Sequence, residues 1–187
     1  HDVRVVNGLN AYEMEMSKYR QYLAMKKYGI RTPRTALAVG ADQLVEAAES
    51  FDGPFITKHN RGGKGLGIEQ FASAGELEAR LASEPFDFGP NEQVLIQQYI
   101  DAPEPYITRV EMVGGRMVLA MQSATDEGFQ LCPSDVCQAK QAPDGGAGRK
   151  FGPSPLEAND PLVDRYRALC AGEDIEIAGI EFVKDAE

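Results

Sequence analysis

The most informative stretch of the chain is His59-Asn60-Arg61-Gly62-Gly63-Lys64-Gly65-Leu66-Gly67. Its four glycines allow backbone N–H groups to approach an anion closely. Lys58, Arg61 and Lys64 add three positive charges, and no acidic residue lies between Phe55 and Gly67. The stretch therefore predicts a loop that holds a polyphosphate. The plainer alternative is a flexible hairpin tip with solubilising charges.

Two familiar phosphate-binding loops do not fit these glycines. A P-loop needs Ser or Thr directly after its Gly-Lys pair, but Gly65 follows Lys64. A dinucleotide-binding turn needs G-x-G-x-x-G opening a helix, whereas here every second residue is glycine and a strand pattern follows. Strands at 54–58 and 68–71 predict a flap that folds over phosphates, as in protein kinases. The kinase motifs HRD and DFG are absent from the sequence.

The rest of the chain divides into short helices and strands. An apolar stripe of Tyr12, Met16, Tyr19 and Leu23 predicts a helix over 11–28. Further helices are expected at 42–50, 74–82 (after Ser73 as N-cap) and 156–170, and strands at 34–39, 94–100, 106–113, 116–122 and 175–183, with weaker strand patterns at 3–6 and 129–132. Gly114-Gly115 predicts a hairpin turn, and residues 123–155 predict a long loop. This order is typical of an α+β protein in two adjoining halves.

Composition narrows the class of protein. The 187 residues carry a formal net charge of −10, which argues against nucleic-acid binding. Residues 1–70 hold 10 basic and 8 acidic side chains, whereas residues 71–187 hold 9 and 21. This split fits separate anion and cation sites, or simply solvated faces. Three cysteines without metal-ligand spacing indicate reduced thiols and the cytoplasm. The sequence contains no run of 18 apolar residues, so no membrane span is predicted.

Six segments, taken in order, carry a family resemblance. They are Ser17-Lys18-Tyr19, Gly29-Ile30-Arg31-Thr32-Pro33-Arg34-Thr35, residues 53–58 with 61–67, Gln97-Gln98-Tyr99-Ile100, residues 109–116 and residues 178–183. Together they resemble the ATP-grasp superfamily, and most of all its ribosomal-protein glutamate ligases and lysine-biosynthesis ligases. The resemblance implies an α+β ATP-grasp fold, with two α+β subdomains that hold ATP between them. The first would span 11–92 with its flap at about 54–71, the second 93–187, and residues 1–10 would remain from a preceding domain.

The resemblance also implies roles for individual residues. Lys18 and Lys58 would contact phosphates from two sides, Arg109 would face the transferred phosphate as a catalytic residue, and Glu181 would bind Mg²⁺ or Mn²⁺. Further contacts with ATP would come from Arg61, Gly62, Gly63, Lys64, Gly65 and Gly67 over the phosphates, and from the backbone of Gln97, Gln98, Tyr99 and Ile100 against adenine. The plainer alternatives are surface lysines, a core strand at 97–100 and a solvent-facing glutamate.

The implied function is an ATP-dependent carboxylate–amine ligase, or carboxylate–thiol ligase, that acts through an acyl phosphate. Its substrates would be small molecules or peptides, with neither nucleic acid nor membrane as a partner. The family's Glu-x-Asn metal ligands and its N-terminal domain have no counterpart in these 187 residues. We therefore expect the ATP-binding part of a longer enzyme, inactive by itself, whose full-length form could be a homo-oligomer.

Three positions depart from the family pattern. Ile107 stands where related ligases have an Asp that contacts the sugar, with Asp101 and Glu104 as the nearest substitutes. Gln130 and Cys132 stand where those ligases have an Arg and an Asn. The departures support a second hypothesis, a non-catalytic or regulatory ATP-binding module on the same fold. A third alternative is an interaction domain that binds no nucleotide.

Overall fold

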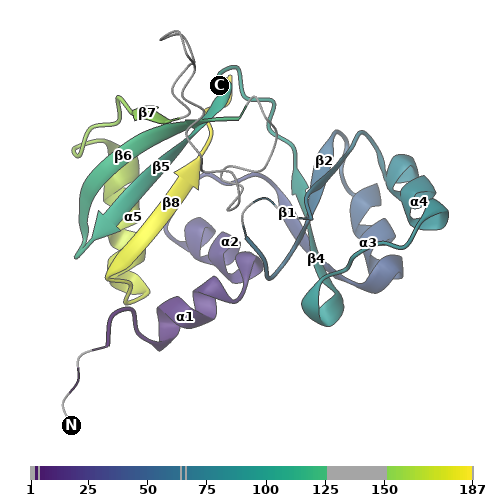
Figure 1. Cartoon of the computed structure of the whole chain (residues 1–187), viewed down its shortest axis with the longest axis horizontal. Helices are drawn as coiled ribbons and strands as arrows, with labels where there is room; N and C mark the ends of the chain where they lie inside the picture. Colours follow the sequence, from purple (N-terminus) through teal and green to yellow (C-terminus); the bar gives the residue numbers. More distant parts are fainter. Residues whose placement is uncertain (1–2, 4, 64, 66, 126–150, 187) are drawn as a thin grey trace, which may run out of the picture.

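In the computed structural model the chain folds into two four-stranded antiparallel sheets with five α-helices among the described residues, which are 3, 5–63, 65, 67–125 and 151–186 (Figure 1). The helices are α1 (Leu9–Glu15), α2 (Lys18–Lys27), α3 (Gly40–Glu49), α4 (Ala74–Ser83), the short 3-10 helix η1 (Pro90–Glu92) and α5 (Pro161–Gly172). The strands are β1 (Thr35–Val39), β2 (Phe55–His59), β3 (Glu69–Phe71), β4 (Gln93–Gln98), β5 (Tyr106–Val113), β6 (Arg116–Ala124), β7 (Phe151–Pro153) and β8 (Ile177–Phe182). The α+β class expected from the sequence is confirmed.

The first sheet has the strand order β1-β4-β2-β3, and α3 and α4 pack on it (Figure 1). Leu44 and Leu77 from the two helices are fully buried and pack with Phe55 and Ile96 of the sheet. Burying a side chain of this size stabilises a fold by about 1.5–3 kcal/mol. The core therefore holds β2 firmly between its neighbours, and β2 leads directly into the glycine loop.

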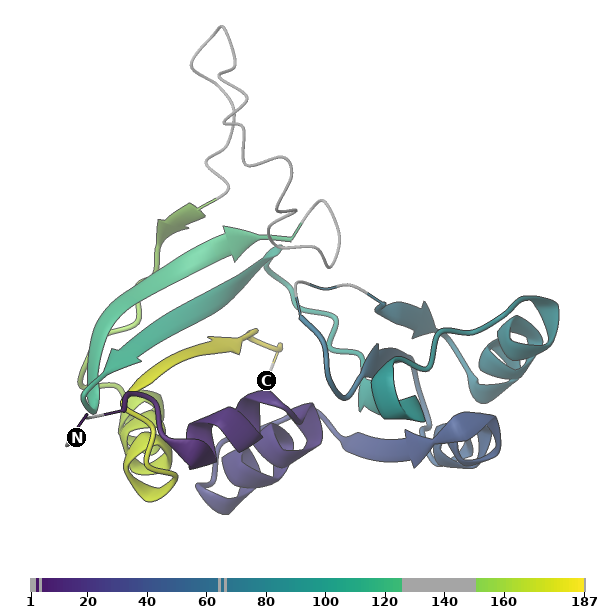
Figure 2. The same ribbon diagram turned by 60° about the horizontal axis from the view of Figure 1, so that its bottom comes forward.

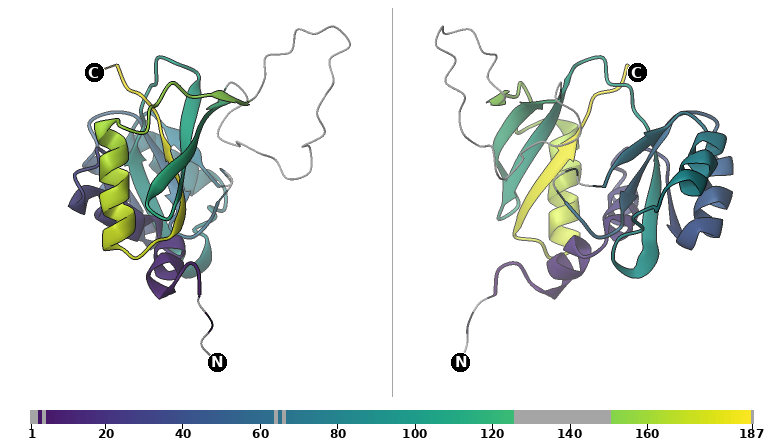
Figure 3. Two further views of the ribbon diagram at one scale, coloured as in Figure 1. Left: turned by 90° about the vertical axis from the view of Figure 1, so that its left-hand side faces the viewer. Right: turned by 45° about the vertical axis from the view of Figure 1, so that its right-hand side comes forward.

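The second sheet has the order β7-β6-β5-β8, and α1, α2 and α5 contribute to the core beneath it (Figures 2 and 3). Val110 and Met112 of β5 are buried there against Tyr166 of α5. Successive side chains of a strand point to opposite faces. Arg109 and Glu111, which alternate with these buried residues, therefore lie on the other face of the sheet.

The helix expected over 11–28 is two helices, and that prediction is corrected. Ser17 is the N-cap of α2, and its hydroxyl accepts a hydrogen bond from the Arg20 N–H. An N-cap residue has extended backbone, so it interrupts the helical path after α1. The expected apolar stripe is consequently not a buried face: Tyr12 is 61% exposed and Leu23 50%, while Met14 and Ala24 face the core.

Other expected elements shift at their ends. Asp160 caps α5, so this helix begins at Pro161 rather than at 156, and α3 begins at Gly40 rather than at 42. β4 ends at Gln98, before 99–100, and β7 lies inside the expected loop 123–155. Ser73 caps α4, and Gly114-Gly115 has the positive φ angles of the predicted turn. Residues 3, 5 and 6 lie outside the strands, so the weak strand pattern at 3–6 is corrected, and 129–132 lie outside the described residues.

The sheets do not coincide with the expected division between residues 92 and 93. β4 is an inner strand of the first sheet, while α1 and α2 contribute to the core of the second. The chain thus crosses between the two halves more than once, and α2 lies between the sheets (Figure 1). Among the described residues, none of the helices has the length and hydropathy that a membrane span needs.

Candidate functional site

A chain of hydrogen bonds across the first sheet holds Lys58. Its ammonium donates to the Gln97 side-chain oxygen at 2.8 Å, and the Gln97 amide nitrogen donates to the Thr35 hydroxyl at 2.8 Å. Burial lowers the pKa of Lys58 to about 8, and the neighbouring charge of Lys18 acts in the same direction. Lys58 is thus a partly buried cation whose hydrogen-bond partner is neutral.

Lys18 reaches the same region from α2, of which it is the first residue. Its ammonium donates to the Gly62 carbonyl, in the glycine loop. Burial lowers the pKa of Lys18, while the carboxylates of Glu15 and Glu181 act in the opposite direction. The fold therefore brings Lys18 within electrostatic range of both Lys58 and Glu181, although α2, β2 and β8 lie far apart in the sequence.

The glycine loop is anchored at its base. The His59 ring packs against Gly67 and Gly89, where a Cβ atom would lie 2.9 Å and 2.6 Å from ring atoms. Both glycines have positive φ, a conformation that other residues rarely adopt. Glycine is therefore required at these two positions for two reasons, the lack of space for a Cβ atom and the positive φ angle.

The remaining flap residues are Arg61, Gly62, Gly63, Lys64 and Gly65. The Gly62 carbonyl accepts a hydrogen bond from the Lys18 ammonium, and no atom of the described residues lies within 4 Å of where a Cβ on Gly63 would be. Gly65 has positive φ, and Arg61 is exposed. The assigned Lys64 lies outside the described residues.

Arg109 lies between two carboxylates on the open face of the second sheet. It donates to Glu111 at 2.7 Å and to Glu181, its cross-strand partner on β8, at 3.0 Å. These hydrogen bonds raise the pKa of Arg109. Gly179 makes room for this arrangement, because a Cβ there would lie 2.1 Å from the Arg109 guanidinium. The expected catalytic residue and the expected metal ligand are thus direct partners.

The segment proposed for adenine follows Gln97 at the end of β4. The Gln98 N–H donates to the Arg34 carbonyl at 2.8 Å, and the Tyr99 N–H donates to the Pro54 carbonyl at 2.9 Å. These two donors are used within the protein. The Ile100 N–H, one residue further and beyond the strand, makes no such backbone hydrogen bond among the described residues.

Glu181 fits a magnesium ion that arrives with a nucleotide. Mg²⁺ is commonly bound by one or two carboxylates together with substrate phosphates. Glu181 supplies one exposed carboxylate, with the phosphate-binding candidate Lys18 in electrostatic range. Within the described part of the chain, no group of three or more His, Cys, Asp and Glu residues could hold a metal ion unaided.

Several site residues have roles that the sequence did not indicate. Gln97 holds Lys58 through its side chain, Glu111 holds Arg109, and Gly179 gives Arg109 space. Glu111 could have been found from its i, i+2 spacing to Arg109 on a strand. The signal for Gly179 is weaker, since it needs the strand register. Of the departing positions, Ile107 lies on β5 opposite Ser123, and Gln130 and Cys132 lie outside the described residues.

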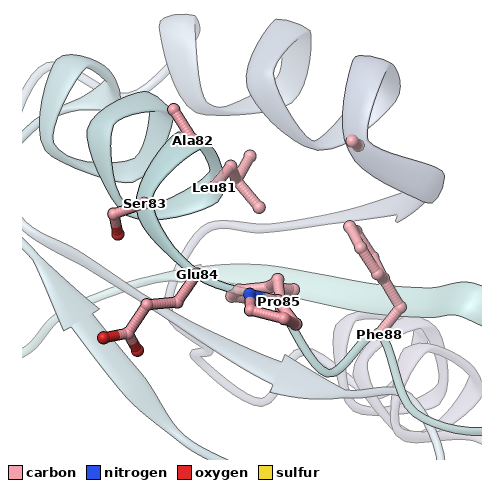
Figure 4. Close-up of a pocket in the computed structure, with 8 residues that line it drawn as sticks. Leu81, Ala82, Ser83, Glu84, Pro85 and Phe88 are labelled. Carbon is pink, nitrogen blue, oxygen red and sulfur yellow. The ribbon is translucent and has the colours of Figure 1, made fainter.

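A shallow pocket of about 380 Å³ lies elsewhere, at the end of α4 and facing α3 (Figure 4). Leu81, Pro85 and Phe88 line it, with Glu84 at its edge. Lys18, Lys58, Arg109 and Glu181 are not among its lining residues. We therefore place the candidate site at the charged cluster and not in this pocket.

The cluster can be compared with known proteins. The RimK-like ATP-grasp domain family matches residues 16–131. A D-alanine--D-alanine ligase from Pseudomonas fluorescens is 32% identical over 99 residues, which cover 52% of this chain and 29% of the relative. A probable alpha-L-glutamate ligase from Teredinibacter turnerae is 29% identical over 125 residues, covering 66% and 40%. The chain thus spans less than half the length of these curated relatives.

The fold has a counterpart among solved structures. The ATP-grasp ligase PsnB, in complex with a precursor variant, Mg and ADP, superposes with a TM-score of 0.64 at 18% identity. The match covers 99% of this chain and 50% of PsnB. The similarity extends through both sheets and therefore supports the ATP-grasp fold expected from the sequence.

Proposed function

This chain belongs to the RimK-like ATP-grasp family, and from that we propose that it is the ATP-binding part of a ligase that joins a carboxylate to an amine. One observation carries the proposal. Lys18 and Lys58 converge at the base of the glycine loop, with Glu181 in electrostatic range. Two cations beside a flap, next to a carboxylate, are what a magnesium–nucleotide complex requires.

The lysines hold the phosphates of ATP in this proposal. Lys58 has already lost part of its hydration and has a neutral partner, so an anion gains more from it than from a lysine in water. Lys18 leaves the Gly62 carbonyl and binds the nucleotide from the other side. The flap, including Arg61, Gly63, Lys64, Gly65 and Gly67, closes over the β- and γ-phosphates. Backbone groups of Gln98, Tyr99 and Ile100 bind adenine, with Ile100 donating.

Glu181 would hold Mg²⁺ (or Mn²⁺) beside the phosphates. The ion, when bound, would neutralise charge on the phosphoryl group being transferred. Arg109, kept in place by Glu111, faces that phosphoryl group in this proposal and stabilises the charge that develops on it.

The proposed reaction has two steps. A substrate carboxylate oxygen attacks the γ-phosphorus of ATP, the bond to the β-phosphate oxygen breaks, and an acyl phosphate and ADP form. An amine then attacks the acyl carbon, the bond to the phosphate oxygen breaks, and the amine loses a proton as inorganic phosphate leaves. A thiol would give a thioester by the same route. The protein contributes position and charge, which supply most catalysis of phosphoryl transfer.

The test uses the whole protein with MgATP and pools of amino acids and short peptides as carboxylates. Hydroxylamine, added as a strong nucleophile, traps an acyl phosphate as a hydroxamate. We expect ADP and hydroxamate in equal amounts, dependent on the carboxylate and abolished by Lys58→Ala. MgATP binding without ADP formation in any pool would instead favour the regulatory module, which the Ile107 departure also favours. Absence of MgATP binding would contradict both.

A further inference from the structure

Asn60 is a buried polar residue at the junction of β2 and the glycine loop. It is 5% exposed, and each of its side-chain and backbone polar atoms makes at least one hydrogen bond. Its side-chain oxygen accepts from the Tyr19 N–H at 2.9 Å and from the Ser17 hydroxyl at 3.1 Å. Its side-chain nitrogen donates to the Gln93 side-chain oxygen at 2.7 Å. Its backbone carbonyl accepts from the Lys18 N–H at 2.9 Å.

These contacts supply hydrogen-bond acceptors, from outside α2, for N–H groups at the start of that helix. The first N–H groups of an α-helix have no partner within it. In α2 the first two belong to Lys18 and Tyr19, and both donate to Asn60. Gln93 then joins Asn60 to β4 through both side chain and backbone. Asn60 thus fixes the backbone of Lys18 to the strands of the first sheet.

Asn60 lies between Lys58 and the contact that Lys18 makes with the glycine loop, and these are the two lysines proposed to bind phosphate. Lys58 precedes Asn60 by two residues on β2, and Gly62, which accepts from the Lys18 ammonium, follows it by two. We propose that Asn60 is the positioning residue for Lys18. It holds the start of α2 so that the Lys18 and Lys58 ammonium groups reach the same phosphates. The inference rests on the proposed nucleotide site and adds to it the residue that aligns its two cations.

A double-mutant cycle separates positioning from general support of the fold. Mg-ADP binding to the whole protein is measured by calorimetry for the wild type, Asn60→Ala, Lys18→Ala and the double variant. We expect Asn60→Ala to weaken Mg-ADP binding about tenfold in the wild type and less than about twofold in Lys18→Ala, since the lysine to be positioned is then absent. Equal losses in both backgrounds would overturn the proposal.

A second ligand gives a readout that a merely structural role would not produce. Adenosine has no phosphate, so Asn60→Ala should leave its affinity within about twofold of the wild type. An equal loss for adenosine and Mg-ADP would also overturn the positioning role. Thr57→Val is the matched control, because Thr57 is a buried polar residue of β2, the strand that leads to Asn60, and its hydroxyl has no hydrogen-bond partner among the described residues. It should change neither affinity.

Conservative and indirect variants keep the test valid if Asn60→Ala does not fold. Asn60→Asp retains the oxygen that accepts from Tyr19 and Ser17, and the Gln93 amide can turn its NH₂ group toward it, so affinity for Mg-ADP should stay within about threefold. Gln93→Ala removes only the side-chain hydrogen bond from Asn60 to β4, keeps the backbone one, and can replace Asn60→Ala in the same cycle. A wild type that binds no Mg-ADP would overturn the proposed function itself, an outcome distinct from binding with additive losses.

Discussion

The two sides of the candidate site treat positive charge in opposite ways. On the first sheet, Lys58 is partly buried, and its ammonium donates to the neutral side chain of Gln97. On the second sheet, the Arg109 side chain is 41% exposed and pairs with the carboxylates of Glu111 and Glu181. Burial without a counter-ion disfavours the charged form of Lys58, whereas the two carboxylates favour the charged form of Arg109.

The difference separates two uses of a cation. A charge that has lost water without gaining a counter-ion raises the free energy of the empty protein, and an anionic ligand relieves that cost. A charge that is already neutralised gains less from a further anion, and its partners fix its position instead. We therefore expect Lys58 to contribute chiefly to binding and Arg109 chiefly to the chemical step.

The largest expected effect tests the binding side of this comparison. Lys58→Ala removes the buried cation and should weaken Mg-ATP binding about 100-fold, since a hydrogen bond to a charged group contributes about 1.5–3 kcal/mol. Calorimetric titration of the whole protein measures it. Lys184→Ala, an exposed lysine after β8, is the control and should have no effect. Unchanged affinity in Lys58→Ala would contradict the assignment of the glycine loop.

A smaller effect is expected at the carboxylate that joins the two sides. Glu181→Gln should raise the Mg²⁺ concentration needed for half-maximal ATP binding about tenfold, because a neutral amide is a poorer ligand for a hard cation. A Mg²⁺ titration at fixed ATP measures this, with Glu157→Gln as an exposed control. Equal Mg²⁺ dependence in wild type and Glu181→Gln would argue that Glu181 only holds Arg109.

Gly179→Ala tests the positioning of Arg109. The new methyl group would lie 2.1 Å from the guanidinium, which must shift from its present position beside Glu111 and Glu181. We expect turnover to fall several-fold, with Mg-ATP affinity nearly unchanged and the free energy of unfolding lowered by about 1 kcal/mol. Gly152→Ala on β7 is the matched control, because no atom of the described residues lies within 4 Å of its added Cβ. A loss of affinity rather than turnover would contradict the division of roles.

The smallest expected effect is a change in the protonation of Lys58 when Mg-ADP binds. Folded Lys58 has a pKa of about 8 against 10.5 for the free side chain. Between these values the unfolded chain binds more protons, so Lys58 makes the free energy of unfolding rise with pH through that window. Bound phosphates favour the charged form and raise the pKa, so Mg-ADP binding at pH 9 should take up a fraction of a proton.

Calorimetry in buffers of different ionisation enthalpy measures the proton uptake. The uptake should disappear in Lys58→Met and should be close to zero for the wild type at pH 7. Uptake that persists in Lys58→Met would assign the titration to another group.

Much of the fold could be predicted from residue patterns. The hairpin of β5 and β6 follows from alternation around Gly114-Gly115, and β2 and β3 follow from short apolar runs that flank the glycines. The pattern failed at Ser17, where an apolar stripe of helical spacing continued through a capping residue. Capping depends on which partners are available to the first N–H groups, and one partner, Asn60, lies 41 residues from Tyr19 in the sequence.

The chemical types in the site follow from the residues alone: a glycine loop, lysines beside it and a carboxylate on the last strand. These are local properties, because a residue carries its charge and flexibility wherever the fold places it. Which of these residues meet depends on how the sheets and helices pack. The pairing of Arg109 with Glu181 comes from the β5–β8 register, and hydrogen bonds to Asn60 hold the start of α2, where Lys18 lies, beside the end of β2. Such contacts depend on distances between elements, which no local pattern specifies.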